Sequence, residues 1–427
     1  MVYIKKDNVA YNLHIIKTKK FKTVSIHVNF KRKFTKEGIT LRNLLGEVLL
    51  ESTKKYPTRR DIILEKENLY HANFLYQSVR SGNYAVLEFR ASFLNDEYTE
   101  EGNAKQAIEF LNEIIFHPNI LNDEFEATSF LRSKNVLKEQ IESAVETPRR
   151  YATKRFLEEF YPNSVFQYMG PGYIEDLEAI SAKSLYEYYN SVLNSDFVDV
   201  FVCGDVDEKE IEELFKNRFA IKTVKKKTES HLIINEKIRK RAKIVTEPKQ
   251  MQQSILMIGC KLPKLTDYER KYVGRLYSYI LGGGAESLLF QNVREKHSLC
   301  YTIHSTFSSV DNNLIIQSGI DAKNAKKAIS LIKKSMKEIA SGKFAEQMID
   351  FFRLVNQTVR KEILDSPVGI INLYRNHEYV GTDLLDKMEE EQAKLTKEDV
   401  MKFASLVKID TIYLLEGGMK IEEVNPQ

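Results

Sequence analysis

One segment of the chain, "LGGGAESLLFQNVREKHSLCY", brings three consecutive glycines close to an arginine and a tyrosine. Glycines that open a helix often bind phosphate through backbone N–H groups. No Gly-Lys-Ser/Thr ending follows here, however, and Ser287 stands where a dinucleotide-binding fingerprint needs its third glycine. A phosphate site is therefore not expected. A tight turn between helices, or a backbone that another group passes closely, is expected at Gly282, Gly283 and Gly284.

Arg294 and Tyr301 are the residues of this segment that could act on a substrate. They are seven positions apart, so they would straddle a helix end and the start of the next strand, and both could point into one cleft. The guanidinium group offers a fork of donors and the phenol a single hydroxyl. Together they can hold a peptide carbonyl or a developing oxyanion. The alternative is an ordinary surface arginine and a tyrosine of the core.

Other candidate groups are less complete. Cys300 and His304 are four positions apart, so on a strand they would share a face and could form a Cys–His dyad. No third residue that would orient the histidine can be named, and both can equally be ordinary strand residues. Glu139 and Glu142 could meet on a helix, where such carboxylates are usually just solvated. The eight histidines are scattered without a pair at ligand spacing, so the local sequence predicts no metal site.

The composition limits the class of protein. The 427 residues suffice for two domains of about 200 residues each. With 43% hydrophobic and 29% charged residues, the chain is neither disordered nor membranous, and a net charge of +4 gives no argument for nucleic acid. No apolar run approaches the roughly 18 residues that span a bilayer, and the N-terminus lacks the apolar core of a signal peptide. Three distant cysteines are typical of reduced thiols, so we expect a cytoplasmic protein.

Strands and helices follow one another in the same order in both halves. In the first half, "TVSIHVNF" (23–30) alternates in a way that predicts an antiparallel strand with one packed face and one face that is wet or lines a cavity. The helix "NAKQAIEFLNEII" (103–115) resembles "NAKKAISLIKKSM" (324–336) at the matching place in the second half. "SAKSLYEYYNSVL" and "FVDVFVCG" are similarly matched by "LTKEDVMKFASLV" and "IDTIYLLEG". An internal duplication is the simplest interpretation.

The predicted fold class is therefore α+β, with two homologous domains that each contain a mostly antiparallel sheet flanked by helices. The first domain is expected over residues 1–220 and the second over residues 246–427. Residues 221–245 are rich in lysine and are interpreted as an exposed linker between them.

Over nearly its whole length the chain resembles the insulinase family of zinc peptidases, whose members carry an H-x-x-E-H motif. The similarity is to the bacterial and mitochondrial processing-peptidase branch. Its most specific part is the family pattern LGGG-x-x-S-x-LF-x-x-VRE-K followed by a tyrosine, which this chain matches from Leu281 to Tyr301. The resemblance implies two homologous α+β domains of about 200 residues each. It also implies that Arg294 and Tyr301 contact the substrate backbone, with the glycines at a helix turn and the cleft rim.

The chain departs from this family where the zinc motif should fall. There it reads "GITLRNLLGEVLLESTKKYPTRRDI", and no histidine stands between His27 and His71. The third zinc ligand, a helix glutamate, corresponds to Gln140, and an accompanying acidic residue falls near Ser133. A catalytic zinc needs three protein ligands and an activated water. We therefore expect no metal in this chain and no hydrolysis by this chain alone.

This combination is similar to the non-catalytic subunits of bacterial heterodimeric peptidases. In such pairs the zinc belongs to one half, and the second domain of the other half supplies the arginine and tyrosine. The predicted function is a substrate-binding subunit of a zinc endopeptidase that processes peptides, with Arg294 and Tyr301 as binding residues and zinc in an H-x-x-E-H partner. The alternative is a stand-alone homodimeric pseudopeptidase that binds peptides or acts as a scaffold. A Cys–His hydrolase is the third hypothesis. No nucleic acid or membrane partner is expected.

Overall fold

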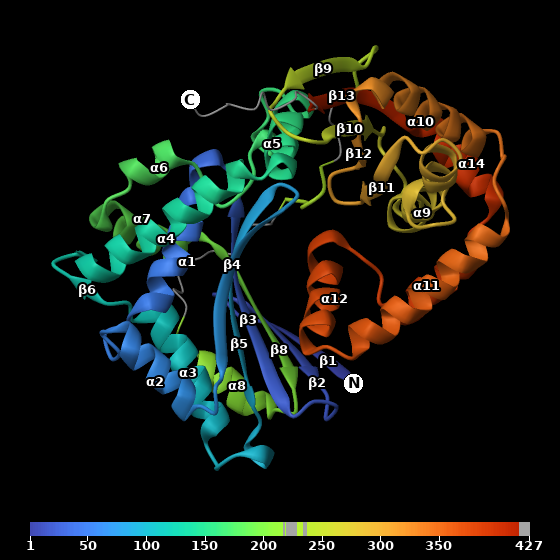
Figure 1. Cartoon of the computed structure of the whole chain (residues 1–427). Helices are drawn as coiled ribbons and strands as arrows, with labels where there is room; N and C mark the ends of the chain where they lie inside the picture. The colour runs from blue at the N-terminus through green and yellow to red at the C-terminus, as the bar shows by residue number, and fades with distance from the viewer. Residues whose placement is uncertain (217, 219–228, 234–236, 418–427) are drawn as a thin grey trace, which may run out of the picture. The chain divides into compact units, whose positions relative to one another are not determined.

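The computed structural model describes residues 1–216, 218, 229–233 and 237–417 (Figure 1). The chain divides into two compact units that are discontinuous in sequence. The first unit contains Met1–Val145, Met169–His231 and Glu362–Gly381, and the second contains Glu146–Tyr168, Leu232–Lys361 and Thr382–Gln427. Residues 221–228 and 234–236 of the predicted linker lie outside the described residues.

The first unit is built on a six-stranded sheet in the order β1-β2-β8-β3-β5-β4. Every neighbouring pair is antiparallel except β2 and β8, which run parallel. The strands are β1 Val2–Asp7, β2 Asn12–Lys17, β3 Thr23–Lys33, β4 Asn73–Ser81, β5 Tyr84–Leu94 and β8 Phe197–Gly204. The alternation in residues 23–30 therefore predicted a strand of this sheet correctly.

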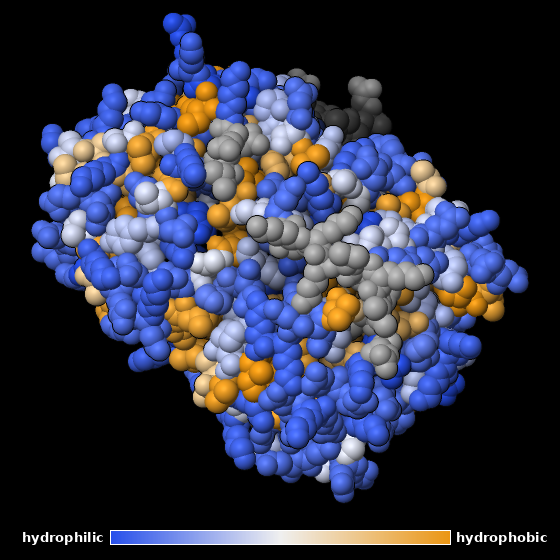
Figure 2. Space-filling model, turned by 180° about the vertical axis from the view of Figure 1, so that it is seen from behind, coloured by the Kyte–Doolittle hydropathy of each residue, from blue (hydrophilic) through white to orange (hydrophobic). Residues whose placement is uncertain are grey.

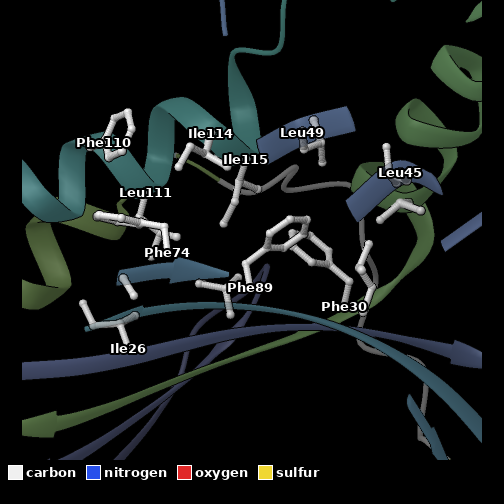
Figure 3. Close-up of a cluster of buried hydrophobic side chains, with 14 of the residues drawn as sticks. Ile26, Phe30, Leu45, Leu49, Phe74, Phe89, Phe110, Leu111, Ile114 and Ile115 are labelled. Atoms are coloured by element: carbon white, nitrogen blue, oxygen red, sulfur yellow. The ribbon is translucent and has the colours of Figure 1, made fainter. Parts of the chain in front are cut away.

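Helices cover one face of this sheet and form the core of the unit with it. In Figure 3 the apolar side chains of Ile26, Phe30 and Phe89 point from the sheet toward Leu45 and Leu111 of the helices above. Because alternate strand residues point to one face, this is the packed face that the sequence predicts. The remaining elements of the unit are α1 Lys36–Glu51, α2 Arg59–Asn68, α3 Asn103–Phe116, β6 Ile120–Leu121, β7 Glu124–Phe125, α4 Ala127–Glu146, α6 Ile174–Ala179, α7 Ala182–Ser195, α8 Glu208–Phe215 and α12 Pro367–Val380.

The opposite face of the sheet is covered by a helix, whereas the sequence predicted a face that is wet or lines a cavity. Ser25, His27 and Asn29 are all buried, because α12 packs against β3 and β8 on this side. Some of the polar groups on this side are paired within the protein, which reduces the free-energy cost of burying them; Asn29 Nδ2 donates to the Tyr379 hydroxyl at 3.2 Å, whereas Asn29 Oδ1 has no hydrogen-bond partner. The hydroxyl of Tyr379 on α12, for example, donates to Asp199 at 2.8 Å. The sequence pattern could not reveal this helix, because it comes from the far half of the chain.

The second unit contains a five-stranded sheet in the order β11-β12-β10-β13-β9. Its only parallel pair within the described residues is β13 with β9. The strands are β9 Lys243–Pro248, β10 Ser254–Lys261, β11 Cys300–Ser308, β12 Asn313–Ile320 and β13 Lys408–Glu416. The helices are α5 Pro148–Phe160, a π-helix Glu269–Val273 that continues into α9 Gly274–Gly282, a π-helix Phe290–Glu295, α10 Ala325–Ala340, α11 Gln347–Leu364, α13 Leu385–Ala393 and α14 Lys397–Leu406. A capping box opens the helical segment that contains the π-helix Glu269–Val273, with Thr266 N donating to Glu269 Oε2 at 2.8 Å and Glu269 N donating to Thr266 Oγ1 at 3.2 Å.

The two sheets confirm the internal duplication. The order β2-β8-β3-β5-β4 in the first unit matches β9-β13-β10-β12-β11 in the second, and the parallel pair falls at the same end of each. The two halves also correspond in one helix each that packs in the unit of the other half. α5 follows α4 in the first half but packs on β10 and β13, whereas α12 follows α11 in the second half but packs on β3 and β8. Both helices begin with a proline, Pro148 and Pro367, which suits the first helical position.

The face of the molecule shown in Figure 2 is largely hydrophilic, as the 29% of charged residues in the sequence leads one to expect. Hydrophobic side chains form separate patches on this face (Figure 2). None of the helices in the described ranges combines the length and apolar character needed to cross a membrane.

Candidate substrate-binding site

Tyr301 lies on an edge strand at a β-bulge. β11 is the outermost strand of the second sheet, and its pairing with β12 shifts register between Cys300 and Thr302. Tyr301 is thus left without a partner in the ladder. Bulges at sheet edges turn side chains away from the regular alternation, and here both Tyr301 and Thr302 are exposed. With 76% of its surface exposed, Tyr301 is not a core tyrosine, so the alternative interpretation of this residue is wrong.

Arg294 lies beside Tyr301. It belongs to the π-helix Phe290–Glu295, in which Lys296 N donates to Gln291 O at 3.0 Å, five residues back. The guanidinium carbon is 5.6 Å from the centroid of the Tyr301 ring and 4.5 Å from that of Phe290. Such cation–π contacts restrict the orientation of the guanidinium group. The structure therefore brings together the two residues that the sequence singled out, with the arginine in contact with two aromatic rings.

Of the three glycines, Gly282 lies against the strand that carries Tyr301. Gly282 is the last residue of α9, and a Cβ there would lie 2.7 Å from Ser305 N of β11. Gly283 is constrained by its own helix, because a Cβ would lie 2.6 Å from Tyr279 Cα, whereas a Cβ on Gly284 would contact nothing within 4 Å. The close backbone approach is thus confirmed for Gly282. The glycines follow the C-terminus of a helix, so they do not form the N-terminal anion site that phosphate needs.

The Cys300–His304 dyad is contradicted by the pairing register. Cys300 stands opposite Ile320 and His304 opposite Gln317. Those two β12 residues are three positions apart, so they point to opposite faces, and the bulge puts Cys300 and His304 on opposite faces as well. Burial raises the pKa of the Cys300 thiol and lowers that of the His304 imidazole. Both shifts oppose a thiolate–imidazolium pair.

Protein side chains fill the region where the resemblance places the metal. Gln140 of α4 donates from Nε2 to Glu47 Oε1 of α1 at 3.1 Å, and the Tyr76 hydroxyl donates to the same oxygen at 2.9 Å. The Tyr76 ring lies directly against Gly46, in the space that any side chain at that helix position would need. Burial and the nearby Glu47 carboxylate raise the pKa of Tyr76 well above its ordinary value, so it stays a neutral donor. Ser133, near which the resemblance places an acidic residue, is buried on α4.

Possible metal ligands elsewhere in the described part of the chain are dispersed. Across the ranges that the structure describes, no three His, Cys, Asp or Glu side chains are grouped so that they could hold an ion. Glu139 and Glu142 are both exposed, as expected of solvated carboxylates. Cys203 and Cys260 are buried and free, and burial raises the pKa of the Cys203 thiol to about 12. These thiols are structural rather than reactive.

Sequence reasoning missed three features, two in the second unit and one in the first. They are the bulge, the π-helix under Arg294 and the contact of Glu47 with Tyr76. The bulge is visible in the burial pattern of the structure. Ile303 and Ser305 are both buried, as alternate residues of a strand should be, whereas the neighbouring Tyr301 and Thr302 are both exposed. The π-helix leaves no signal in the sequence, because one extra residue per turn does not change which side chains are apolar. The Tyr76 contact could be suspected only from a glycine in the middle of a helix.

The chain is similar to known proteins both in sequence and in structure. The family model described as "Peptidase M16 inactive domain" matches residues 179–351. A protein of Bacillus subtilis (strain 168), called "Probable inactive metalloprotease YmfF", is 30% identical over 97% of both chains. A second protein of that organism, "Uncharacterized zinc protease YmxG", is 26% identical over 57% of this chain and 59% of its own.

Solved structures share the fold of this chain. A conserved protein from Enterococcus faecalis V583 superposes with a TM-score of 0.91 at 28% identity, covering 98% of this chain and 100% of that one. A peptidase M16 inactive domain from Pseudomonas fluorescens has a TM-score of 0.79 at 16% identity and covers 100% of both chains. At that identity the likeness shows the fold alone.

Proposed function

The chain belongs to the M16, or insulinase, family of metallopeptidases as an inactive homologue, and from this we propose that it is the substrate-binding, non-catalytic subunit of a heterodimeric zinc endopeptidase. In this proposal Arg294 and Tyr301 enter the active-site chamber of a homologous partner that carries H-x-x-E-H and zinc. The substrate is a peptide that the pair processes.

One observation carries the proposal. Arg294 and Tyr301 lie together, with the guanidinium carbon 5.6 Å from the ring centroid. In the first unit, where metal ligands would be needed, Gln140 and Tyr76 both donate to Glu47. Binding groups retained in the second unit, together with an occupied metal-ligand position in the first unit, favour a binding subunit.

The chemistry of this chain would be limited to binding and orientation. Zinc, when bound in the partner, supplies a Lewis acid and an activated water, and the partner's motif glutamate would act as general base. The guanidinium N–H groups of Arg294 and the Tyr301 hydroxyl would donate to peptide carbonyl oxygens and to the oxygen that gains charge. The peptide would be extended and add to a sheet edge of the partner. Removing one such donor typically lowers kcat by about 10²- to 10³-fold.

The first experiment is to purify the tagged chain from its own cells and to identify stoichiometric partners by mass spectrometry. We expect a partner with H-x-x-E-H, and the cytoplasm is the proposed compartment because all three cysteines are free. Self-association alone would instead favour the homodimeric peptide-binding pseudopeptidase.

The second experiment measures peptide hydrolysis by the reconstituted pair. Arg294→Ala should lower kcat at least tenfold, and Tyr301→Phe should lower it less, because the ring and its contact with Arg294 remain. Arg150→Ala is the matched control, since Arg150 is an exposed arginine of α5 in the same unit. Assembly should be unchanged in all three variants. Full turnover in Arg294→Ala would sink the assignment.

A further inference from the structure

Helix α11 carries an exposed apolar stripe. Phe351, Val355 and Val359 are spaced four residues apart and Leu354 lies beside them, so their side chains occupy one face of the helix. Their exposed fractions are 47%, 46%, 41% and 61% for Phe351, Val355, Val359 and Leu354. Scattered apolar residues on a surface need no explanation, but a continuous row on one helix face indicates a binding surface.

The internal duplication gives this stripe a counterpart in the first unit. The prolines that begin α5 and α12 set a shift of 219 positions between the halves, from Pro148 to Pro367. Under this shift the buried residues of the first turns of α4 fall on buried residues of α11 without a gap. The matched pairs are Ser129 with Met348, Phe130 with Ile349, and Ser133 with Phe352. α4 and α11 are therefore equivalent helices in the same rotational setting.

The same shift aligns Val359 with Gln140 and Phe351 with Arg132. Arg132 Nη1 is 2.7 Å from Glu51 Oε1 and Gln140 Nε2 is 3.1 Å from Glu47 Oε1, so this face of α4 lies along α1. This face of α4 carries Gln140, which the resemblance places at the position of the family's third zinc ligand. In the second unit, the apolar stripe of α11 is thus equivalent to the face of α4 that carries the family's metal-ligand position in the first unit.

The size of the stripe distinguishes between a peptide and a folded partner. At roughly 150–200 Å² for a full side chain, the four residues present roughly 350 Å² of surface, well below the ~800 Å² per partner of a stable protein interface. The stripe runs over nine residues from Phe351 to Val359, and their eight helical rises amount to about 12 Å. An extended chain covers this length with about four residues.

We infer that the α11 stripe binds an apolar segment of about four residues in the extended peptide substrate. This inference rests on the proposed function and adds the class of substrate, a peptide with consecutive apolar residues. Arg294 and Tyr301 would hold the backbone of the peptide, and the stripe would select its side chains.

Binding to the full chain alone tests the inference. The probe is a fluorescein-labelled eight-residue peptide with Leu-Val-Leu-Val at its centre, and the reference is the same peptide with four serines there. Fluorescence anisotropy should show binding of the apolar peptide only. The double variant Leu354→Ser, Val359→Ser should weaken it at least tenfold. Since these residues are exposed, the fold should be retained, which circular dichroism would verify.

Leu131→Ser is the matched control, because Leu131 is a helix leucine of α4 with a similar exposed fraction, 57% against 61% for Leu354, at a position equivalent to Asp350. Equal affinity of the wild type and the double variant for the apolar peptide overturns the inference, and so does equal binding of the serine peptide. A dimer that dissociates in the double variant during sedimentation also overturns it, since the stripe would then be a subunit contact. Unchanged turnover in Arg294→Ala refutes the proposed function separately, without affecting the anisotropy result.

Discussion

Arg42 of α1 and Asp196, the residue after α7, form an ion pair in which both side chains are fully buried. Arg42 Nη1 also donates to Phe30 O at 3.0 Å, and Arg32 binds the other oxygen of Asp196. Removing one member of a buried pair leaves an undercompensated charge, which typically costs about 3–5 kcal/mol. Since Arg32 remains, we expect Arg42→Ala to lower the free energy of unfolding by about 3 kcal/mol, measured by urea denaturation.

Arg32→Ala is the comparison for this pair. The Arg32 side chain is 25% exposed, so solvent can replace part of its contact with Asp196, and the expected loss is about 1 kcal/mol. If Arg42→Ala lowers the free energy of unfolding no more than Arg32→Ala does, burial does not determine how much the ion pair with Asp196 contributes.

Gly282 should tolerate no side chain, because it lies against the backbone of β11. In Gly282→Ala the Cβ would be 2.7 Å from Ser305 N, so α9 and β11 must separate, at a cost of about 1–3 kcal/mol. Peptide turnover by the reconstituted pair should also fall, since β11 carries Tyr301. Gly284→Ala is the control, as a Cβ there contacts nothing within 4 Å. Thermal unfolding and turnover of both variants provide the test, and equal effects would contradict the role given to Gly282.

The sequence predicted the elements of the fold far better than the contacts between them. Alternation and helical spacing are local properties, so β3, α3 and the repeat of both in the second half could be read directly. The burial of His27 and Asn29 could not, because it depends on α12, which follows more than 330 residues later. In the same way the family pattern predicted which arginine and tyrosine to examine. Their geometry depends on a bulge and a π-helix that no residue type requires.

Metal content is a direct test of the filled ligand position. We expect the purified chain to contain far less than one zinc ion by mass spectrometry of the metals, and its unfolding temperature to be unchanged by EDTA. The physical reason is that Glu47 already accepts hydrogen bonds from Tyr76 and Gln140, and imidazole ligands are missing there. The zinc-bearing partner, measured in parallel, should lose its metal and its activity. Stoichiometric zinc in this chain alone would refute the expectation.

Stability should fall in acid because of the polar groups buried beneath α12. Burial alone would raise the pKa of Glu88, but the hydrogen bond with His27 and the charges of Arg375 and Arg90 lower it to about 2. Burial would likewise raise the pKa of Asp199, but the charge of Lys31 at 2.9 Å and the contacts with His14 and Asn12 together outweigh this and lower it. The stabilisation from these carboxylates is present above their ordinary pKa values near 4 and is lost as the pH falls toward the lowered values.

His231 contributes at a higher pH and can be separated from the carboxylates. It stacks between Tyr84 and Tyr379, and burial, with the charge of Lys31, lowers its pKa from 6.5 to about 4. The unfolded chain therefore binds the proton first, so stability decreases as the pH falls from about 6.5 to about 4, by up to about 3 kcal/mol. Urea denaturation at pH 7.5, 5.5 and 4.5 should show this slope in the wild type and a flatter one in His231→Phe, which keeps the ring stack but cannot titrate. His117→Gln, at an exposed position, should keep the wild-type slope. The same slope in His231→Phe would mean that another group titrates in this range.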